Sequence, residues 1–333
     1  MRHKLKNKKI LITGADGFIG SHLVEFLVEI GANVKAFCLY NSWNNIGWLS
    51  DLPEEVISKV ELITGDIRDQ TRVKEAVDGV AYVFHLASLI GIPYSYVAYR
   101  SYYQTNVLGT LNILEACKLN KSIERIIHTS TSEVYGSAQQ IPINESHPLV
   151  GQSPYSASKI AADKLAESFY LSFNLPIITL RPFNTFGPRQ TTRAVIPSII
   201  SQLVTGVKKL HLGNIHATRD FNYVLDTVRS ITALSVKKKA IGKTINIGTG
   251  KEISIKETAS TIMNIMNYKV PIVSQKKRLR PKNSEVNRLI ADTKLMNSLI
   301  NKDKRYSFKN GIEETINWIR KNQKYFIKNE YKI

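Results

Sequence analysis

The sequence predicts an α/β protein with a doubly wound parallel sheet, followed by a smaller mixed α/β lobe. Two observations indicate this class. In the first half of the chain, continuous apolar runs alternate with segments of helical periodicity, as in parallel strands that are buried on both faces and joined by helices. In the second half, the apolar runs are shorter and are interrupted by proline and glycine, which indicates a different arrangement.

Apolar runs and glycines divide the first half into elements. KKILITGA is typical of a buried strand, and GSHLVEFLVEIG after it of a helix that ends at Gly31. The run NVKAFCL then predicts the second strand. Together, strands are expected at residues 8–15, 33–39, 60–66, 80–88 and 124–132, and helices at residues 20–31, 70–77 and 104–119.

The pattern changes after the run LPIITLRP. Pro182 and the Gly-Pro pair that follows interrupt the chain, and shorter mixed elements lead to a last helix near residues 309–326. We therefore expect one domain at residues 1–181. Residues 182–333 are expected to form mainly a second lobe, with some segments returning to the sheet.

The chain carries an excess of basic side chains. Its 333 residues include 46 Lys and Arg against 27 Asp and Glu, a formal charge of +19. Such a charge suits a nucleic-acid or anionic-surface binder, but no recognition-helix, zinc-finger or RNP-type pattern accompanies it. A generally basic surface is favoured over a specific nucleic-acid site, and an anionic substrate would also be attracted by this field.

Cysteine usage and hydropathy indicate the compartment. Cys38 and Cys117 are too few for a disulfide framework and lack metal-ligand spacing. The first residues contain no apolar stretch of signal-peptide length, and no run approaches the ~18 apolar residues needed to span a bilayer. We expect a soluble cytoplasmic protein with no metal site and no membrane partner.

A glycine-rich loop joins the first strand to the first helix. In TGADGFIG, glycines stand at Gly14, Gly17 and Gly20, with Phe18 and Ile19 between them. Glycine permits a tight turn, a close approach of the backbone to a pyrophosphate, and packing of helix on strand, while the helix N-terminus stabilises the phosphate charge. Alone, GxxGxxG also fits a plain tight turn. Its position between strand and helix favours a dinucleotide site.

The acid that often follows the second strand in such sites is missing. Cys38 stands where a side chain would bind the adenosine ribose. Tyr40, Asn41 and Ser42 could accept either ribose, so NAD and NADP both remain open. Asp66, after the third strand, could accept a hydrogen bond from adenine or could cap the helix that follows.

The stretch YSASK contains a second chemical signature. Tyr155 and Lys159 are four residues apart, so in a helix both side chains lie on one face. A phenol is a weak base at neutral pH, but a nearby ammonium and a cationic nicotinamide favour the phenolate. Lys159 would also bind the nicotinamide ribose. A tyrosine and a lysine at this spacing often occur by chance. A chance occurrence is less expected in a chain that also has a glycine loop earlier in its sequence.

Taken together, these motifs resemble the extended short-chain dehydrogenase/reductase family, and within it the nucleotide-sugar 4,6-dehydratase branch. The resemblance implies a Rossmann-type NAD(P)-binding domain at residues 1–181 and a nucleotide-sugar lobe at residues 182–333. It also implies a tightly bound NAD or NADP that is regenerated within each turnover. The motifs are GxxGxxG at 14–20, DIRD at 66–69, HLA at 85–87, NVLGT at 106–110, TSTSEVYG at 129–136, YSASK at 155–159, RPFNTFGPRQ at 181–190, RDFNYVLD at 219–226, NIGTG at 246–250 and RLRPKNSEVNRL at 278–289.

The resemblance carries roles onto individual residues. Thr131 would hydrogen-bond the sugar 4-hydroxyl, with Tyr155 as the base. Besides the glycine loop, Tyr155 and Lys159, the implied cofactor contacts are Asp66, Ile67, Leu86 and Ala87. The substrate nucleotide and pyrophosphate would be held by Asn184, Arg189, Arg219 and Arg280, with Arg278 as a competitor of Arg280. Arginine suits this role because it offers permanently charged bidentate donors.

Glu133 distinguishes between two reactions. A 4-epimerase of the family needs no carboxylate at this position, whereas a 4,6-dehydratase needs a base for the C-5 proton. Glucose-type dehydratases carry Asp-Glu here, and this chain has Ser132 and Glu133, like the mannose-type branch. Glu133 could serve as base and then acid, or Ser132 could relay a proton through water, and a halt at a 5,6-ene product is conceivable.

The sequence therefore leads to a hypothesis with two alternatives. The hypothesis is a homodimeric nucleotide-sugar 4,6-dehydratase acting on UDP- or GDP-N-acetylglucosamine in nonulosonic acid and cell-surface polysaccharide biosynthesis. The resemblance implies that helices near 96–118 and 154–173 form the dimer interface. The alternatives are a 4-epimerase or 4-ketoreductase of the same family and, more remotely, a nucleic-acid-binding protein. The loop NSWNNIGWLSDLP could be a flap over the site or a packed surface loop.

Overall fold

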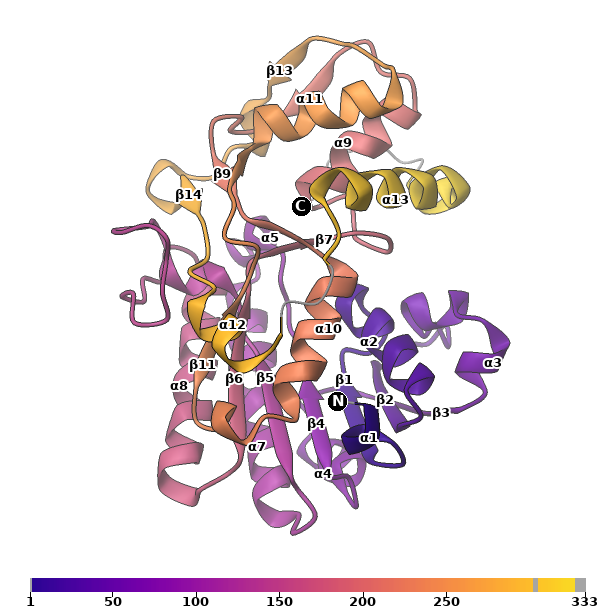
Figure 1. Cartoon of the computed structure of the whole chain (residues 1–333), viewed down its shortest axis with the longest axis vertical. Coiled ribbons are helices and arrows are strands. Elements are labelled where there is room, and N and C mark those ends of the chain that lie inside the picture. The colour runs from indigo at the N-terminus through magenta and orange to yellow at the C-terminus, as the bar shows by residue number, and fades with distance from the viewer. Residues whose placement is uncertain (1, 302–304, 327–333) are drawn as a thin grey trace.

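The computed structural model describes residues 2–301 and 305–326 (Figure 1). Its centre is a parallel sheet of seven strands in the order β11-β6-β5-β4-β1-β2-β3. The chain builds one half outward from β1 and then crosses to β4, so the predicted doubly wound sheet is confirmed. The strands are β1 (Lys9–Thr13), β2 (Asn33–Leu39), β3 (Val60–Gly65), β4 (Tyr82–His85), β5 (Arg125–Thr129), β6 (Ile177–Pro182) and β11 (Thr244–Ile247).

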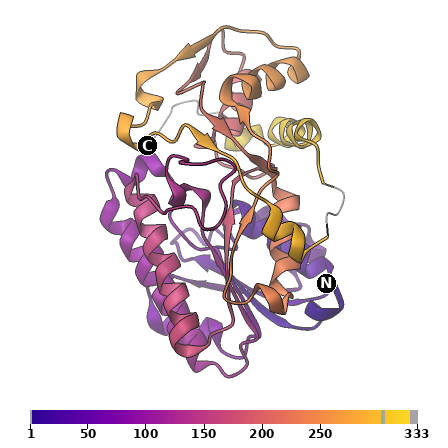
Figure 2. The ribbon, with the colours of Figure 1, turned by 60° about the vertical axis from the view of Figure 1, so that its left-hand side comes forward.

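Alternate side chains of each strand pack on opposite faces of the sheet. In β1, Ile10 and Ile12 belong to the core on one face and Leu11 to the core on the other, because the side-chain period of a strand is two. Burying each such side chain contributes about 1.5–3 kcal/mol. The first face is covered by α2 (Phe18–Glu29) and α10 (Val224–Ser235), and the second by α4 (Gln70–Val77), α7 (Gly109–Leu119) and α8 (Pro154–Phe173). Figure 2 shows α8 running along the outside of the sheet.

The second half of the chain forms a lobe beyond one end of the sheet (Figure 1). Its apolar core is separate from the two cores of the sheet and is made by three helices and short strands. The helices are α9 (Val195–Val204), α11 (Ile255–Met266) and α13 (Phe308–Lys321), and the strands are β7 (Asn184–Phe186), β8 (Leu210–Leu212), β10 (Phe221–Tyr223), β12 (Ile253–Ser254) and β13 (Ile272–Ser274). Two further short strands of this half, β9 (Thr218–Arg219) and β14 (Arg288–Leu289), pair with each other outside this core.

Three elements of the second half return to the sheet. α10 packs on its first face, β11 pairs with β6, and α12 (Lys294–Leu299) packs beside β11. The remaining helices are short: α1 (Arg2–Leu5), α3 (Glu54–Ile57), α5 (Ile92–Ser95) and α6 (Tyr99–Tyr102), with a π-helical turn at Tyr103–Leu108 before α7 and 3-10 turns at Gly47–Asp51, Ser132–Tyr135, Lys238–Ala240, Lys276–Arg278, Lys282–Ser284 and Gln323–Tyr325. Among the described residues, no helix combines the length and apolarity needed to cross a membrane.

The loop between β2 and β3 is packed against the rest of the molecule. The ring of Trp48 lies edge-on to the rings of Trp318 and Tyr325, with centroids 5.2 and 5.0 Å away. Asn41 closes the loop, because its side chain accepts hydrogen bonds from the backbone of Trp43 and Asn45. These contacts fit a packed surface loop better than a free flap.

Candidate active site

The end of β5 leads directly into the candidate catalytic residues. Thr131 follows the strand and caps the 3-10 turn Ser132–Tyr135, because its hydroxyl accepts a hydrogen bond from the Glu133 N–H at 3.2 Å. Ser132 is buried, whereas Thr131 and Glu133 are partly exposed. The turn therefore presents a hydroxyl and a carboxylate at the carboxyl edge of the sheet, where open α/β sheets bind ligands.

The start of α8 brings a phenol and an ammonium to the same edge. Ser153 caps the helix by exchanging hydrogen bonds with Ser156, and Pro154 occupies its first turn. Tyr155 and Lys159 then lie one turn apart, and only 6% and 3% of their surfaces are exposed. The predicted pair is therefore formed on one helix face and is buried against the sheet.

The environment of Tyr155 favours a neutral phenol in the protein alone. Burial raises the pKa of Tyr155 and the charge of Glu133 raises it further, whereas a hydrogen bond with the Thr131 side chain lowers it. The ring of Tyr102 packs edge-on against the Tyr155 ring, with centroids 6.1 Å apart. The phenol is thus oriented by Tyr102 and Thr131 and needs additional positive charge to ionise near neutral pH.

Lys159 is held below this phenol by the end of β5. Its Nζ donates a hydrogen bond to the Thr129 carbonyl oxygen at 2.8 Å. Burial lowers the pKa of Lys159 to about 8, against an opposing contribution from Asp163. At neutral pH most of the molecules therefore carry the ammonium form.

A buried polar network lies behind Lys159. Asp163 accepts hydrogen bonds from Nε2 of His128 at 3.0 Å and from two guanidinium nitrogens of Arg181 at 2.9 and 3.1 Å. Burial alone would raise the pKa of Asp163, but His128 and Arg181 outweigh it and the pKa is lowered. Burial lowers the pKa of His128, so in this contact a neutral imidazole donates a hydrogen bond to the Asp163 carboxylate. Arg181 also donates to the hydroxyl of Tyr135 at 3.0 Å, so the network joins α8, β5 and β6 to the catalytic turn.

Two arginines from the lobe reach the region of Glu133. A guanidinium nitrogen of Arg280 lies 3.3 Å from Oε2 of Glu133. Arg219, on β9, lies 3.8 Å from Glu285. Burial would lower the pKa of Arg280, but the charges of Glu133 and Glu285 outweigh burial and raise this pKa. For Arg219 burial is the larger effect and lowers the pKa, although Glu133 and Glu285 act in the opposite direction. These four side chains form one cluster of alternating charge, which we call the arginine–glutamate cluster.

The other predicted substrate residues differ in their surroundings. Oδ1 of Asn184, at the start of β7, is buried and has no hydrogen-bond partner within the described part of the chain, so it can accept from a ligand. Arg189 donates to Glu25 on α2 at 2.9 Å, so its contacts are not with the arginine–glutamate cluster. Arg278 donates to Gln275 at 3.0 Å and Ser198 at 3.2 Å, which places it in the lobe.

The glycine loop has the close approaches that a dinucleotide site requires. Gly14 has a φ of +67°, and a Cβ there would lie 2.8 Å from the backbone nitrogen of Ala87. A Cβ on Gly20 would lie 2.1 Å from the carbonyl oxygen of Gly14. α2 begins at Phe18 without a side-chain cap on its N–H groups, which leaves them free for an anion. These residues fit the pyrophosphate of NAD or NADP.

The remaining predicted cofactor residues border this loop. The N–H groups of Leu86 and Ala87 both donate to the Thr13 hydroxyl at 3.2 Å, and Ile67 is buried. Asp66 is bound to the Arg68 guanidinium, which lowers the Asp66 pKa. The alternative in which Asp66 caps the next helix is wrong, because Asp69 caps α4 by accepting from the Arg72 N–H.

Sequence reasoning missed some residues of the site. Asp163 could have been predicted from the helix spacing, because it follows Lys159 by four residues and therefore lies on the same face of α8. Glu285 and Arg181 gave no local signal, since their partners are distant in the sequence.

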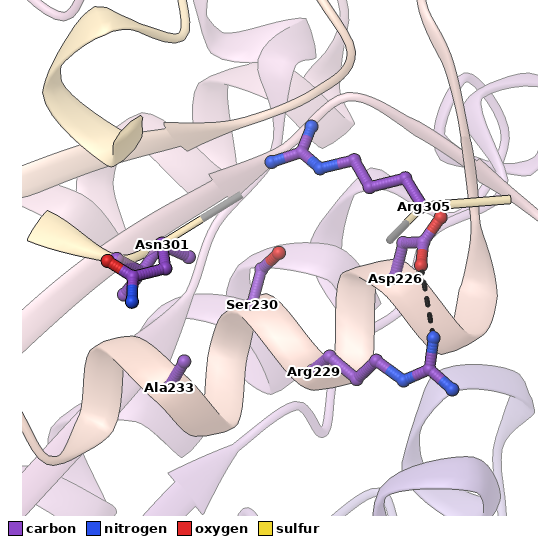
Figure 3. Close-up of a pocket in the computed structure, with 7 residues that line it drawn as sticks. Asp226, Arg229, Ser230, Ala233, Asn301 and Arg305 are labelled. Atoms are coloured by element: carbon purple, nitrogen blue, oxygen red, sulfur yellow. Dashed lines mark ion pairs between the residues drawn. The ribbon is translucent and has the colours of Figure 1, made fainter. Parts of the chain in front are cut away.

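A small hollow opens elsewhere, between α10 and the segment around Asn301 (Figure 3). It is lined by Asp226, Arg229, Ser230, Ala233, Ile300, Asn301 and Arg305. Asp226 and Arg229 form an ion pair of 3.5 Å within it. None of the candidate catalytic residues lines this hollow. Within residues 2–301 and 305–326, no three His, Cys, Asp or Glu side chains gather as metal ligands would.

Comparison with known proteins identifies similar sequences. The sequence model of the family described as GDP-mannose 4,6 dehydratase matches residues 11–315. The chain is 34% identical to dTDP-D-glucose 4,6-dehydratase of Dictyostelium discoideum over 78% of this chain and 62% of that protein. It is 32% identical to an uncharacterised UDP-glucose epimerase of Bacillus subtilis over 93% of this chain and 98% of that protein.

Solved structures have the same fold. One is a mutant UDP-glucuronic acid 4-epimerase from Bacillus cereus in complex with NAD and a fluorinated UDP-glucuronic acid, which is 28% identical. It superposes with a TM-score of 0.85 and covers 94% of this chain and 99% of its own. The architecture is thus similar to that of a protein with NAD bound.

Proposed function

The chain belongs to the family of nucleotide-sugar dehydratases and epimerases that the GDP-mannose 4,6-dehydratase model describes, and we propose that it is a nucleotide-sugar 4,6-dehydratase. The cofactor of this family is NAD or NADP. The single observation that carries the proposal is the carboxylate of Glu133 beside Thr131 and Tyr155, next to the buried Arg219 and the partly buried Arg280. A 4-epimerase needs the phenol but not the carboxylate.

In the first step, Thr131 orients the sugar 4-hydroxyl and Tyr155 takes its proton. Lys159 keeps the phenolate stable, because its ammonium lies one helical turn away. NAD or NADP, when bound, would supply the hydride acceptor for C-4 in its oxidised form, whose positive charge would favour the phenolate, and the hydride donor for C-6 in its reduced form. Thr131 and Tyr155 thereby hold the 4-keto sugar in place for elimination.

In the second step, Glu133 removes the C-5 proton, which the 4-keto group has made acidic. The 6-hydroxyl leaves as water and needs a proton. Glu133 can return the proton that it took, or Ser132 can relay one through water; both routes use groups of the same turn. After hydride reaches C-6, C-5 takes a proton from solvent and Tyr155 releases to solvent the proton that it took from the 4-hydroxyl, so the net change is the loss of one water. A reaction that halted at the 4-keto-5,6-ene, before this hydride transfer, would give a product lighter by a further two hydrogens and would leave the cofactor reduced.

The arginine–glutamate cluster would connect substrate binding with this base. A substrate diphosphate is a stronger partner for Arg219 and Arg280 than a single carboxylate, because it offers several charged oxygens. Binding would therefore draw Arg280 away from Glu133 and leave the carboxylate available as a base. The unpaired Oδ1 of Asn184 would accept from the substrate. Arg189, bound to Glu25, is the weakest of the proposed substrate residues.

For the substrate itself we propose N-acetylglucosamine linked to UDP or GDP, on a route to nonulosonic acids of cell-surface polysaccharides. The motifs YNSWNNIGWL and RPKNSEV support this through their resemblance to dehydratases that act on N-acetylglucosamine linked to UDP or GDP. The ion pairs that Arg280 and Glu285 of RPKNSEV make in the arginine–glutamate cluster support only the nucleotide diphosphate. The motif YNSWNNIGWL packs on the glycine loop and on α13. This segment would therefore affect binding of the cofactor rather than of the sugar. We assign residues 1–181 to the cofactor and residues 182–333 mainly to the nucleotide sugar.

A homodimer is also part of the proposal. Apolar side chains remain exposed along the helices that the family resemblance assigns to the interface, and a second copy would cover them. They are Val97, Tyr99, Tyr103, Leu108, Leu119, Leu171 and Phe173. No specific nucleic-acid partner is proposed; tight, salt-sensitive DNA binding without turnover of any nucleotide sugar would favour that reading.

A 4-epimerase or 4-ketoreductase is the second candidate. The observation that favours it is the similarity to proteins named as epimerases in Bacillus subtilis and Bacillus cereus. Thr131, Tyr155 and Lys159 would suffice for it. In an epimerase, Glu133 would serve only as the partner of Arg280.

One experiment separates the two. The purified protein is incubated with a panel of UDP-, GDP- and dTDP-sugars, and the product mass and NMR spectrum are recorded. Loss of one water without net cofactor consumption supports the dehydratase. An unchanged mass with inverted C-4 would overturn it in favour of epimerisation.

A further inference from the structure

The second strand ends without a charged side chain. Cys38 is fully buried, and burial raises the pKa of its thiol to about 12, so it remains neutral. The next two side chains, Leu39 and Tyr40, are 58% and 66% exposed. The strand itself therefore supplies no acid for the adenosine ribose, which in Rossmann-type sites lies at this point.

The glycine loop supplies a carboxylate at the same point. Oδ2 of Asp16 accepts a hydrogen bond from the backbone N–H of Leu39 at 3.4 Å. The loop is bound to β2 because the N–H groups of Gly14 and Ala15 both donate to the carbonyl oxygen of Phe37, at 3.1 and 3.3 Å. The Asp16 carboxylate thus lies against the carboxyl end of β2, although it stands before the first helix in the sequence.

The loop after β2 fixes this orientation. The N–H of Trp48 donates to the Asp16 carbonyl oxygen at 3.0 Å. Gly47 has a φ of +58°, and a Cβ on it would lie 2.4 Å from that same oxygen and 2.9 Å from Cβ of Asp16. Because the Trp48 ring is packed on Trp318 and Tyr325, the backbone behind Asp16 has little freedom to move.

Two of the groups that could compete for the ribose are already engaged. The side-chain oxygen of Asn41 accepts from Trp43 and Asn45 within its own loop. Arg68, which follows the neighbouring strand β3 and would suit a 2'-phosphate, is bound to Asp66. The Asp16 carboxylate has no cationic partner among the residues that the structure describes, so it retains free acceptor positions.

From this arrangement we propose that Asp16 takes the place of the missing β2 acid and makes the protein selective for NAD over NADP. Its carboxylate accepts a hydrogen bond from the ribose 2'-hydroxyl and repels a 2'-phosphate, because two anionic groups cannot share this half-buried position without a cation. The proposal concerns the cofactor alone. It holds whether the reaction is dehydration or epimerisation, so the two conclusions can fail separately.

Cofactor affinity tests the proposal without measuring turnover. NAD and NADP are titrated by calorimetry into the nucleotide-free full-length protein, and the nucleotides released from freshly purified protein by denaturation are identified by mass. We expect the wild type to bind NAD about tenfold to 100-fold more tightly than NADP. In Asp16→Asn and Asp16→Ala this ratio should fall about tenfold or more, chiefly through tighter NADP binding.

Asp78→Asn is the matched control, because it removes the same charge from an exposed position after α4 and should keep the wild-type ratio. Thermal unfolding shows which variants fold. If Asp16→Asn does not fold, Asp16→Ala is the variant compared with Asp78→Asn. Equal affinities of the wild type for both cofactors would overturn the proposal. The proposal would also be overturned if a folded Asp16 variant had the same ratio of NAD to NADP affinity as Asp78→Asn.

Discussion

Glu133 and Arg280 approach to 3.3 Å across 147 residues of sequence. The carboxylate belongs to the turn after β5 and the guanidinium to the lobe, and both are largely buried. A buried ion pair contributes little net stability, because desolvation offsets the attraction. Its significance here is functional: the candidate base is held by a side chain that a substrate diphosphate would also bind.

Replacing the candidate base tests the reaction type. Glu133→Gln should lower the rate of water loss about 10²-fold to 10⁴-fold, because the C-5 proton loses its acceptor. Oxidation at C-4 should persist, so reduced cofactor accumulates and is visible by absorbance. The control is Glu167→Gln, an exposed residue of α8. Water loss at the control rate would contradict the assigned role.

Removing Arg280 tests substrate binding. Arg280→Ala should raise the KM for the nucleotide sugar about tenfold to 100-fold, because a charged hydrogen bond to the diphosphate is lost. Arg189→Ala should change KM little, because Arg189 is bound to Glu25. Steady-state kinetics of both variants give the comparison. Equal increases in KM would mean that Arg189 also reaches the substrate.

The depressed pKa of Lys159 predicts an alkaline limit of activity. Burial lowers the pKa to about 8, so the ammonium is present below this pH and is lost as pH rises through it. The rate of C-4 oxidation should therefore fall toward tenfold per pH unit above that point. Lys159→Arg, whose guanidinium stays charged, should show no such limit in any activity that remains. A wild-type rate that is flat up to about pH 10 would rule out a role for the ammonium.

Asp163 should set both this limit and the stability of the sheet. Asp163 raises the pKa of Lys159, so Asp163→Asn should move the alkaline limit to lower pH. It should also lower the free energy of unfolding by about 3–5 kcal/mol, because Arg181 would be left as an unpaired buried charge. Asp69→Ala, which removes the cap of α4, should cost about 1 kcal/mol and leave the pH profile unchanged. If the alkaline limit of activity did not move in Asp163→Asn, Asp163 would have a structural role only.

The exposed apolar helix faces predict the oligomeric state. Leu108, the last residue of the π-helical turn before α7, is 52% exposed. Leu108→Glu should convert a dimer to a monomer by placing a charge in an apolar interface. Light scattering after size exclusion measures the mass. Leu62→Glu, at an exposed position on β3, is the control. A wild-type monomer would refute the dimer directly.

Local patterns in the sequence were sufficient for most of the fold. The buried strands, the glycine loop, and the helix carrying Tyr155 and Lys159 were predicted because each depends on neighbouring residues: apolar runs, glycine at tight turns, and a spacing of four on one helix face. Boundaries were less accurate. The expected strand at 80–88 ends at His85, and Leu86 and Ala87 form the loop beside Gly14.

Contacts between segments that are distant in the sequence could not be predicted from local patterns. Asp66 offered two local interpretations, and only the structure ruled out the helix cap, since Asp69 caps α4 while Asp66 binds Arg68. The assignment of Arg189 to the substrate came from its motif, whereas its contact with Glu25 depends on how the lobe meets α2. Motif position alone does not determine the partner of a long, charged side chain.

The sequence by itself determined the class of the fold and the chemical groups available: a hydroxyl, a carboxylate, a phenol and an ammonium at Thr131, Glu133, Tyr155 and Lys159. The tertiary structure decided what surrounds them. It paired Glu133 with Arg280, placed Asp163 behind Lys159, and brought Asp16 to the end of β2. The physical reason is that local patterns act over one turn of helix or strand, whereas charge pairing and burial depend on residues that only the folded chain brings together.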